Sequence, residues 1–391
     1  MMKIAFFCIP AHGHTNPTLG VVKELIARGH EVWYYSYESL REKIESTGAV
    51  FIPCDAYDTE QKLTPQDGAR IGKDIAFSTK VLVDTTLALD EMVCHAMEEW
   101  KPDCIVADSM AFWGKMVAWK LGIPFVCSTT TFAFNQYSSK VMKQSTGELF
   151  KMMFSMSKVG KEIRRLKEHG YPVKNVLDII GSDNETDTVV YTSPEFQPFS
   201  ETFSEKYAFV GPSIRPVQKP FKKEKETLIY ISMGTVNNDL VPLYRNVIQA
   251  LAGTGYQVVL AVGEMVDLKQ LGELPENITA AAYVDQMAVL EKADVFLSHC
   301  GMNSASESMY FGVPLLMLPQ TTEQNGVASR VEELGAGIFL KDTSLSGIHA
   351  AVEQILQTPA YRINAEKIAD SFKKCSGAKG AADKILEVCK K

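Results

Sequence analysis

One apolar run in the second half of the chain leads into residues that have the types and spacing of an anion site. His299 follows the strand-like run at residues 295–297, and a turn of small residues then leads into a segment of good helix formers. Backbone N–H groups at the start of such a helix point at a bound anion, and the helix dipole favours that anion. A diphosphate suits this arrangement, which therefore indicates a sugar-nucleotide site.

A similar pattern occurs once in the first half. The residues from Asp103 to Asp108 form an apolar run ahead of a Gly-Ile-Pro turn, and those from Asp294 to His299 form another ahead of Gly-Val-Pro. The echo predicts two related halves in which Asp108 and His299 occupy equivalent strand ends. Because parallel sheets bind ligands at the carboxyl ends of their strands, both side chains are expected to face the cleft between the halves.

The elements around these residues alternate apolar strand-like runs with amphipathic helices, which predicts an α/β fold with parallel sheets. Asn16 is expected to cap a helix that has Pro17 at its first position and ends at Gly29. The expected strands are residues 4–9, 31–36, 50–53, 228–232, 257–262, 294–297 and 315–318, and the expected helices of the first half are residues 17–28 and 40–46.

The length of 391 residues favours two domains. Residues 211–225 hold three prolines and a lysine cluster without an apolar period, as a linker would. We therefore expect an N-terminal domain at residues 1–211, a linker at 212–226 and a C-terminal domain at 227–372.

Composition excludes several classes of protein. A net charge of −7 with scattered basic residues argues against nucleic acid or an anionic membrane as partner. The chain has no run of eighteen apolar residues and no secretory leader, so a soluble cytoplasmic protein is expected. Its eight cysteines form no C-x-x-C pair, which fits reduced core thiols.

Two segments carry a family resemblance. Residues 283–324 resemble the signature of the UDP-glycosyltransferase superfamily, and residues 11–17, Ala-His-Gly-His-Thr-Asn-Pro, resemble the opening of its macrolide-type bacterial branch. Residues 190–198 and 211–212 are also similar to that branch. The resemblance implies the GT-B architecture, in which two Rossmann-like domains face each other across a cleft. The first would bind the acceptor and the second the donor, and a C-terminal helix at 373–391 would cross back to the first domain.

The same resemblance assigns the donor site residue by residue. His299 would contact the pyrophosphate and Glu307 a ribose hydroxyl, while Glu323 and Gln324 would read the sugar hydroxyls. The remaining donor-site candidates lie at the nucleoside or at small-residue turns near the phosphates: Ser232, Gly234, Thr235, Tyr283, Gln286, Gly301, Asn303 and Ser304.

Three positions depart from the family's usual pattern. Tyr283 stands where tryptophan usually stacks on the base, and Asp285 replaces a proline. These two changes leave UDP and TDP donors as alternatives. Glu323 replaces the more common aspartate and reaches one methylene further, which leaves the identity of the sugar open.

The resemblance also implies that His14 is the catalytic base and Asp108 its partner. The reference pKa of histidine is about 6.5, so a neutral imidazole is available to take a proton from an acceptor hydroxyl. A buried carboxylate on the other ring nitrogen fixes the tautomer and stabilises the imidazolium that forms. Asp108 also has the side chain to cap a helix expected near Met110.

The sequence predicts no metal and no cofactor. It has no D-x-D motif, and the backbone amides near Gly301, the Ser304 hydroxyl and the His299 ring can each give the diphosphate a hydrogen bond. A hydrogen bond to a charged group contributes about 1.5–3 kcal/mol. The family further implies inversion at the anomeric carbon.

The acceptor is predicted only as a class. Methionines and aromatic residues cluster in the first half and are core residues by default, but some are expected to line a pocket for flat apolar acceptors such as phenols, flavonoids or macrolides. The candidates are Met110, Phe112, Thr130 and Phe132.

Three other functions can be compared with sugar transfer. A nicotinamide dehydrogenase needs G-x-G-x-x-G after the first strand, whereas residues 10–14 supply one glycine. A sugar-nucleotide epimerase of GT-B fold and a UDP-sugar-binding protein without catalysis stay as alternatives to transfer of a hexose, in particular glucose, from a UDP-sugar. The oligomeric state is left open.

Overall fold

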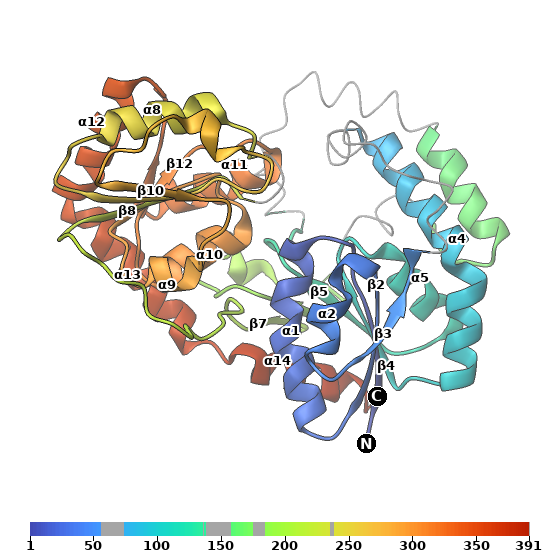
Figure 1. Cartoon of the computed structure of the whole chain (residues 1–391). Helices are drawn as coiled ribbons and strands as arrows, with labels where there is room; N and C mark the ends of the chain where they lie inside the picture. The colour runs from blue at the N-terminus through green and yellow to red at the C-terminus, as the bar shows by residue number, and fades with distance from the viewer. Residues whose placement is uncertain (56–73, 136, 138–157, 175–183, 235–237, 391) are drawn as a thin grey trace. The chain divides into compact units, whose positions relative to one another are not determined.

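A computed structural model describes residues 1–55, 74–135, 137, 158–174, 184–234 and 238–390. The chain divides into two compact units (Figure 1). The first contains residues 1–213 together with 375–391, and the second contains residues 214–374.

The first unit is built on a sheet of seven parallel strands in the order β3-β2-β1-β4-β5-β6-β7. The strands are β1 (Lys3–Phe7), β2 (Glu31–Ser36), β3 (Val50–Pro53), β4 (Cys104–Asp108), β5 (Phe125–Thr129), β6 (Thr188–Val190) and β7 (Tyr207–Phe209). The three strands expected before residue 55 are all present, and β2 and β3 have the predicted bounds.

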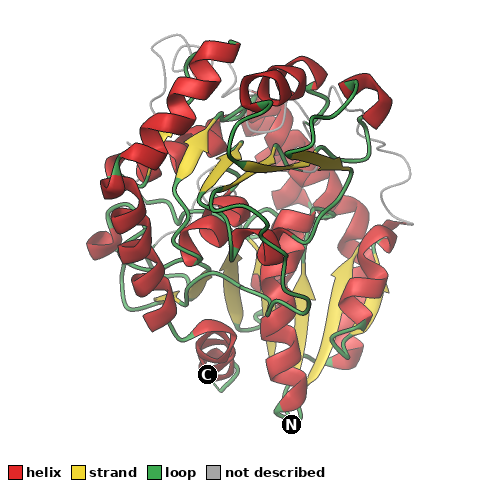
Figure 2. Cartoon of the chain, turned by 60° about the vertical axis from the view of Figure 1, so that its left-hand side comes forward, coloured by secondary structure: helices red, strands yellow, loops and turns green. Residues whose placement is uncertain are grey.

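Helices cover both faces of this sheet (Figure 2), because successive strand residues point to opposite sides. Ile4 and Phe6 pack with α1 (His12–Ala27), α2 (Arg41–Glu45) and α14 (Gly377–Val388). Ala5 and Phe7 pack with α4 (Ile75–Trp100) and α5 (Phe112–Leu121). Short 3-10 turns occur at η1 (Glu38–Leu40) and η4 (Ser200–Thr202), and residues 158–168 are helical.

The predicted start of the first helix is wrong. Helix α1 begins at His12 with Ala11 as its N-cap, and Pro17 lies inside it. The N–H of Thr15 already donates to the carbonyl of Ala11 at 3.0 Å, so the first turn closes before Asn16. The end is as predicted, because Gly29 has a φ of +81° and lies just beyond the helix. The earlier start places His14 in the first turn.

The last helix belongs to the first unit. Ala381, Ala382 and Ile385 of α14 are buried in the same apolar cluster as strands β1, β2 and β4. Nζ of Lys384 forms an ion pair of 2.7 Å with Asp187, next to β6.

The second unit contains a six-stranded parallel sheet in the order β10-β9-β8-β11-β12-β13. Its strands are β8 (Leu228–Ser232), β9 (Gln257–Ala261), β10 (Ile278–Ala281), β11 (Val295–Ser298), β12 (Leu315–Met317) and β13 (Gly337–Phe339). Each of the four strands predicted in this half is present within one residue at either end.

The helices of the second unit follow the expected alternation. They are α8 (Val241–Leu251), α9 (Gln286–Leu290), α10 (Met302–Tyr310), α11 (Thr322–Glu333), α12 (Leu345–Gln357) and α13 (Pro359–Lys374), with a 3-10 turn η5 (Leu268–Leu271). Apolar residues of α8 and α12 cover one face of the sheet, and α13 packs on α10.

The two sheets share one strand order, which confirms the internal echo. Numbered within its own unit, the first sheet runs 3-2-1-4-5-6-7 and the second runs 3-2-1-4-5-6, so β4 and β11 occupy the same place beside the first strand. In sheets of this order, ligands bind at the carboxyl ends of the strands beside the point where the order reverses. That point lies between β1 and β4 in the first unit and between β8 and β11 in the second. Across the described ranges, no helix is both long and apolar enough to cross a membrane.

Candidate active site

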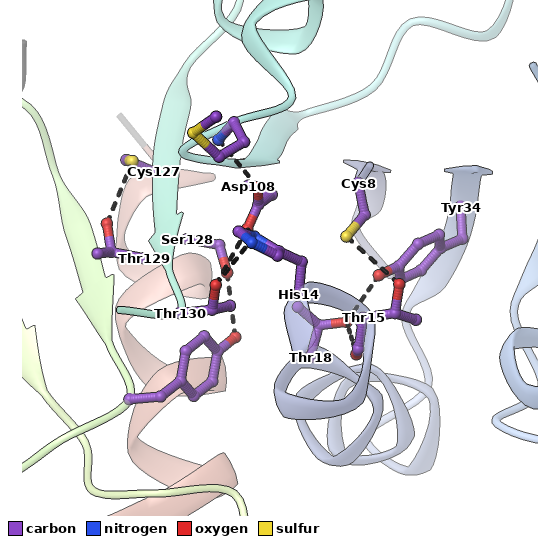
Figure 3. A network of polar contacts seen from close by, with 12 residues as sticks. Cys8, His14, Thr15, Thr18, Tyr34, Asp108, Cys127, Ser128, Thr129 and Thr130 are labelled. Carbon is purple, nitrogen blue, oxygen red and sulfur yellow. Dashed lines mark hydrogen bonds and ion pairs between the residues drawn. The ribbon is translucent and has the colours of Figure 1, made fainter. Parts of the chain in front are cut away.

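His14 and Asp108 meet at the reversal point of the first sheet (Figure 3). His14 lies in the first turn of α1, just after β1, and Asp108 is the last residue of the neighbouring β4. Nδ1 of His14 lies 2.9 Å from Oδ2 of Asp108. The carboxylate is fully buried, while 26 % of the His14 side chain is exposed. The pair therefore joins a protected carboxylate to an accessible imidazole.

The two oxygens of Asp108 have different partners. Oδ1 accepts a hydrogen bond of 2.8 Å from the backbone N–H of Met110, and Oδ2 faces His14. Helix α5 begins at Phe112 with Ala111 as its N-cap, so Asp108 binds the turn before the helix instead of capping the helix itself. The turn holds the carboxylate in place and leaves its second oxygen for the imidazole.

This geometry selects one tautomer of a neutral His14. Nδ1 must carry the ring proton to donate it to Asp108, which leaves the lone pair on Nε2. A lone pair on Nε2 can accept a proton from a hydroxyl. The arrangement is therefore that of a general base with an orienting carboxylate.

A layer of buried polar side chains lies around the pair. Thr18 hydrogen bonds the Tyr34 hydroxyl at 2.7 Å, and Ser128 donates to the Tyr191 hydroxyl at 3.2 Å (Figure 3). Burial, and then the charge of Asp108, raise the pKa of the Cys8 thiol and the pKa of the Tyr191 phenol. Both groups stay protonated, so Asp108 has no second anion beside it in this layer.

The acceptor candidates separate into two groups. Phe112 is 2 % exposed and packs with Val83 and Met116, and Phe132 is 3 % exposed with its ring 5.5 Å from that of Phe196. These two rings are core residues in the structure and present almost no surface. Met110 is 37 % exposed, and Thr130 touches the His14–Asp108 pair.

In the second unit, His299 follows β11 and leads into α10. Its ring lies against two glycines: a Cβ atom on Gly234 would be 2.6 Å from Cε1 of His299, and one on Gly301 would be 2.6 Å from Nε2. Gly234, which follows Ser232 at the end of β8, also has a φ of +82°. Glycine at both positions is what lets the ring occupy this place. Thr235 lies outside the described residues.

His299 is neutral at physiological pH. Burial lowers its pKa to about 4, and the nearby backbone of Ser232 offsets that shift only in part. A neutral ring contributes a hydrogen-bond donor to a diphosphate rather than a positive charge. The electrostatic attraction for a bound diphosphate must then come from backbone dipoles.

The start of α10 supplies such dipoles. Gly301 is the N-cap, and Asn303 and Ser304 lie in the first turn. Cys300 has a φ of +60°, a conformation that few residues other than glycine adopt, and its N–H donates to Oγ of Ser298 at 3.1 Å. Strained turns of this kind cluster at binding sites. The turn from 298 to 301 leads directly into the first turn of α10, whose backbone dipoles favour an anion.

Gln286 connects the residues expected to bind the nucleoside. Its Nε2 donates to Oε2 of Glu307 at 2.5 Å and lies 3.5 Å from Oγ of Ser304, and its Oε1 accepts from Tyr230 at 3.1 Å. Burial raises the pKa of Glu307 to about 7, although Gln286 and Arg215 act in the opposite direction. Tyr283 is 77 % exposed, so its ring is open to stacking.

Asp285, the departure from the family's proline, has a partner that the sequence did not reveal. Arg215 donates to both carboxylate oxygens of Asp285, at 2.5 and 3.4 Å. Asp285 also caps α9 through the N–H of Ala288. Arg215 lies in the segment expected to be a linker, where no motif marks it.

The pair expected to read the sugar lies at the start of α11. Oε1 of Gln324 accepts a hydrogen bond of 2.8 Å from the backbone of Gln320, and Thr321 caps the helix through the N–H of Gln324. Glu323 is exposed in the first turn. Gln324 is thus held by its oxygen and can donate through its NH₂ group. Within the described ranges, no three His, Cys, Asp or Glu side chains gather as a metal site requires.

Comparison with known proteins agrees with this geometry. The chain is 31 % identical to the uncharacterized UDP-glucosyltransferase YojK of Bacillus subtilis, over 100 % of this chain and 98 % of the relative. It is 34 % identical to the NDP-glycosyltransferase YjiC of Bacillus licheniformis, over 98 % and 96 %. The chain belongs to the UDP-glycosyltransferase superfamily. This glycosyltransferase also matches the family described as "Erythromycin biosynthesis protein CIII-like, C-terminal domain", at residues 245–381.

Solved structures identify the fold of this glycosyltransferase as GT-B. The calicheamicin glycosyltransferase CalG4 is 27 % identical with a TM-score of 0.84, covering 100 % of this chain and 99 % of that chain. The glycotransferase of kitacinnamycin is 26 % identical with a TM-score of 0.86, covering 99 % of both. The expected fold class is confirmed.

Proposed function

We propose that this glycosyltransferase moves a hexose, in particular glucose, from a UDP-sugar to a hydroxyl of a small apolar acceptor such as a phenol, a flavonoid or a macrolide. The observation that carries the proposal is the 2.9 Å contact between Nδ1 of His14 and Oδ2 of Asp108, with the imidazole partly exposed. Such a pair activates a hydroxyl, and a hydroxyl is what a sugar acceptor provides.

The reaction proposed is one displacement with inversion. Nε2 of His14 takes the acceptor proton as the acceptor oxygen bonds to the anomeric carbon, and the bond from that carbon to the diphosphate breaks. Asp108 stabilises the imidazolium that results. The electron pair of the broken bond leaves with the nucleoside diphosphate.

The leaving diphosphate is proposed to bind at the turn between β11 and α10 without a metal ion. Supporting this are the neutral His299 donor, the start of α10 just after the turn, and the Ser304 hydroxyl. A few hydrogen bonds to a charged group, at about 1.5–3 kcal/mol each, are of the size needed to hold it.

The donor preference is proposed from the nucleoside side of the site. Glu307 would accept a ribose hydroxyl and Tyr283 would stack on the base. Names of relatives support a nucleoside-diphosphate sugar, since one is a UDP-glucosyltransferase and another an NDP-glycosyltransferase. The replacements at Tyr283 and Asp285 make TDP-sugars the second donor class to test.

A mass-spectrometric screen tests the proposal. Purified protein is incubated with UDP-glucose, other UDP-sugars and TDP-sugars against a panel of phenols, flavonoids and macrolides. A hexose adduct on an acceptor, with UDP released only when that acceptor is present, is the expected result. UDP-sugar isomers formed without acceptor would favour an epimerase. Binding of UDP with no product from any acceptor would favour a binding protein.

A further inference from the structure

Thr130 forms a third contact at the His14–Asp108 pair. Its Oγ1 lies 3.0 Å from Nδ1 of His14 and 3.5 Å from Oδ2 of Asp108 (Figure 3). The residue is only 5 % exposed, so its hydroxyl is held among protein groups instead of turning freely in water. It lies directly after β5, the neighbour of β4 in the sheet.

When His14 acts as a base, only one assignment of hydrogen-bond donors and acceptors fits His14, Asp108 and Thr130. Nδ1 of His14 carries a proton, so it cannot accept one from Thr130, and Oγ1 of Thr130 must accept a share of the Nδ1–H. The hydroxyl proton of Thr130 is then directed to the carboxylate of Asp108. Each donor has an acceptor in this arrangement, and no two lone pairs face each other.

The opposite tautomer makes the role of the hydroxyl clear. With the proton on Nε2, the lone pair of Nδ1 would face the carboxylate at 2.9 Å, and the Thr130 hydroxyl alone could donate to it. Such a ring could not take a proton through Nε2. Asp108 therefore disfavours this tautomer, and the Thr130 hydroxyl fits the active one by accepting from Nδ1–H and donating to Asp108.

We propose that Thr130 is a positioning residue that, by accepting a hydrogen bond from Nδ1–H of His14 and donating one to Asp108, holds the imidazole in the orientation that presents Nε2 to the acceptor. The proposal rests on the proposed function of His14 as a base. Thr130 acts through His14 and makes no bond to the reacting atoms in this role.

Thr130→Val tests the role, because valine keeps the shape and removes the hydroxyl. The expected result is a fall in kcat of about threefold to tenfold, the effect of losing one hydrogen bond, with the KM values for donor and acceptor nearly unchanged. Thr130→Ser is expected to restore kcat. Thr129→Val is the matched control, since Thr129 is equally buried and bonds Sγ of Cys127 at 3.6 Å.

A double-mutant cycle separates positioning from general damage to the fold. In a His14→Ala background, Thr130→Val is expected to change the residual rate by less than about twofold, because no imidazole is left to position. A Thr130→Val effect that is as large without His14 as with it would overturn the proposal. So would an effect confined to the KM of the donor, which would make Thr130 a sugar contact.

Nitrogen NMR of protein with labelled histidines gives a readout that needs no turnover. The His14 signals are expected to show the proton mainly on Nδ1 in both proteins, and the Nδ1 and Nδ1–H signals are expected to shift in Thr130→Val because Nδ1–H loses one of its two acceptors. Unchanged His14 signals in the variant would overturn the proposal even if transfer activity is never found. If Thr130→Val melts at a lower temperature than Thr129→Val, the same NMR comparison is made with Thr130→Ala.

Discussion

A Cβ atom placed on Gly234 would lie 2.6 Å from Cε1 of His299, closer than real Cβ atoms come to their neighbours. The glycine and the imidazole come from separate segments, the ends of β8 and β11, which are adjacent in the sheet. The proposed diphosphate site therefore depends on a residue whose contribution is the absence of a side chain.

Gly234→Ala is expected to displace the His299 ring and weaken donor binding. Losing one hydrogen bond to a charged group costs about 1.5–3 kcal/mol, or about 10-fold to 150-fold in affinity. Calorimetric titration with UDP measures the change. Gly253→Ala is the control, because Gly253 also has a positive φ, of +65°, but has open space around its Cα. Equal UDP affinity in both variants would contradict the prediction.

Asp108→Asn is expected to invert the tautomer of His14. The new NH₂ group can donate to Nδ1, which favours the proton on Nε2 and removes the base. We expect kcat to fall by about 10²-fold to 10⁴-fold, as for loss of general-base catalysis, while the affinity for UDP stays within about twofold. Steady-state kinetics and a UDP titration on the same preparation measure both. A variant with nearly normal kcat would refute the assignment of His14.

Ile385→Ala tests how strongly α14 stabilises the first unit. Ile385 is 1 % exposed within the apolar cluster that contains strands β1, β2 and β4, so its truncation leaves a cavity. The expected loss is about 2–5 kcal/mol in the free energy of unfolding. On the same helix, Asp383 makes an exposed ion pair with Arg28, and Asp383→Ala is expected to cost no more than about 1 kcal/mol. Denaturant titration compares the two, and similar losses would contradict the role of α14.

The sequence predicted the strands that are continuous apolar runs bounded by turns, which are β1 to β4 in the first unit and β8, β9, β11 and β12 in the second. It did not predict β5, β6, β7, β10 and β13, of which β6, β7 and β13 have only three residues each. The start of α1 was missed for a physical reason: Asn16-Pro17 has the composition of a helix start, but the turn from Ala11 to Thr15 closes earlier and Pro17 is accommodated inside the helix. The echo between residues 103–108 and 294–299 predicted the equivalence of β4 and β11 because each run fills the same place in its sheet.

Site residues inside motifs could be named from the sequence, and those outside motifs could not. His14 and Asp108 are 94 residues apart in the chain, and the contact between them follows from the pairing of β1 with β4. Arg215 has no motif around it, and its bond to Asp285 depends on the path of the chain into β8. Thr130 was expected to face the acceptor, and only its position after β5 reveals the contact with His14.

Chelator is expected to leave transfer unchanged, because the proposed diphosphate site relies on hydrogen bonds from protein groups. Rates with EDTA and with added magnesium ion should agree within about twofold, less than the effect of losing one of those bonds. The assay measures UDP release with the best acceptor from the screen. A strict requirement for a divalent cation would show that the turn before α10 cannot hold the leaving group alone.

Glu307 is expected to make donor binding depend on pH near neutrality. Its pKa is raised to about 7, so the carboxylate proposed to accept a ribose hydroxyl is lost as the pH falls below that value, and the donor KM is expected to rise. Arg215→Ala removes a cation that lowers this pKa, so the rise in KM is expected to begin at a higher pH. Glu307→Gln is expected to raise the donor KM but to abolish its change between pH 6 and 8, since His299 titrates near pH 4.

The raised pKa of Glu307 also makes the free energy of unfolding fall as the pH rises, whereas a carboxylate with a lowered pKa makes it rise. The unfolded chain releases the Glu307 proton near the ordinary glutamate pKa of 4.5, whereas the folded chain holds it until about 7. The stabilisation from the protonated group is therefore complete below pH 4.5 and is lost as the pH rises to 7. Glu307→Gln is expected to unfold at a higher temperature than wild type at pH 8, with the difference vanishing at pH 4.5. A variant that is less stable than wild type at pH 8 would mean that the carboxylate is stabilised in the fold and that Glu307 is ionised well below neutrality.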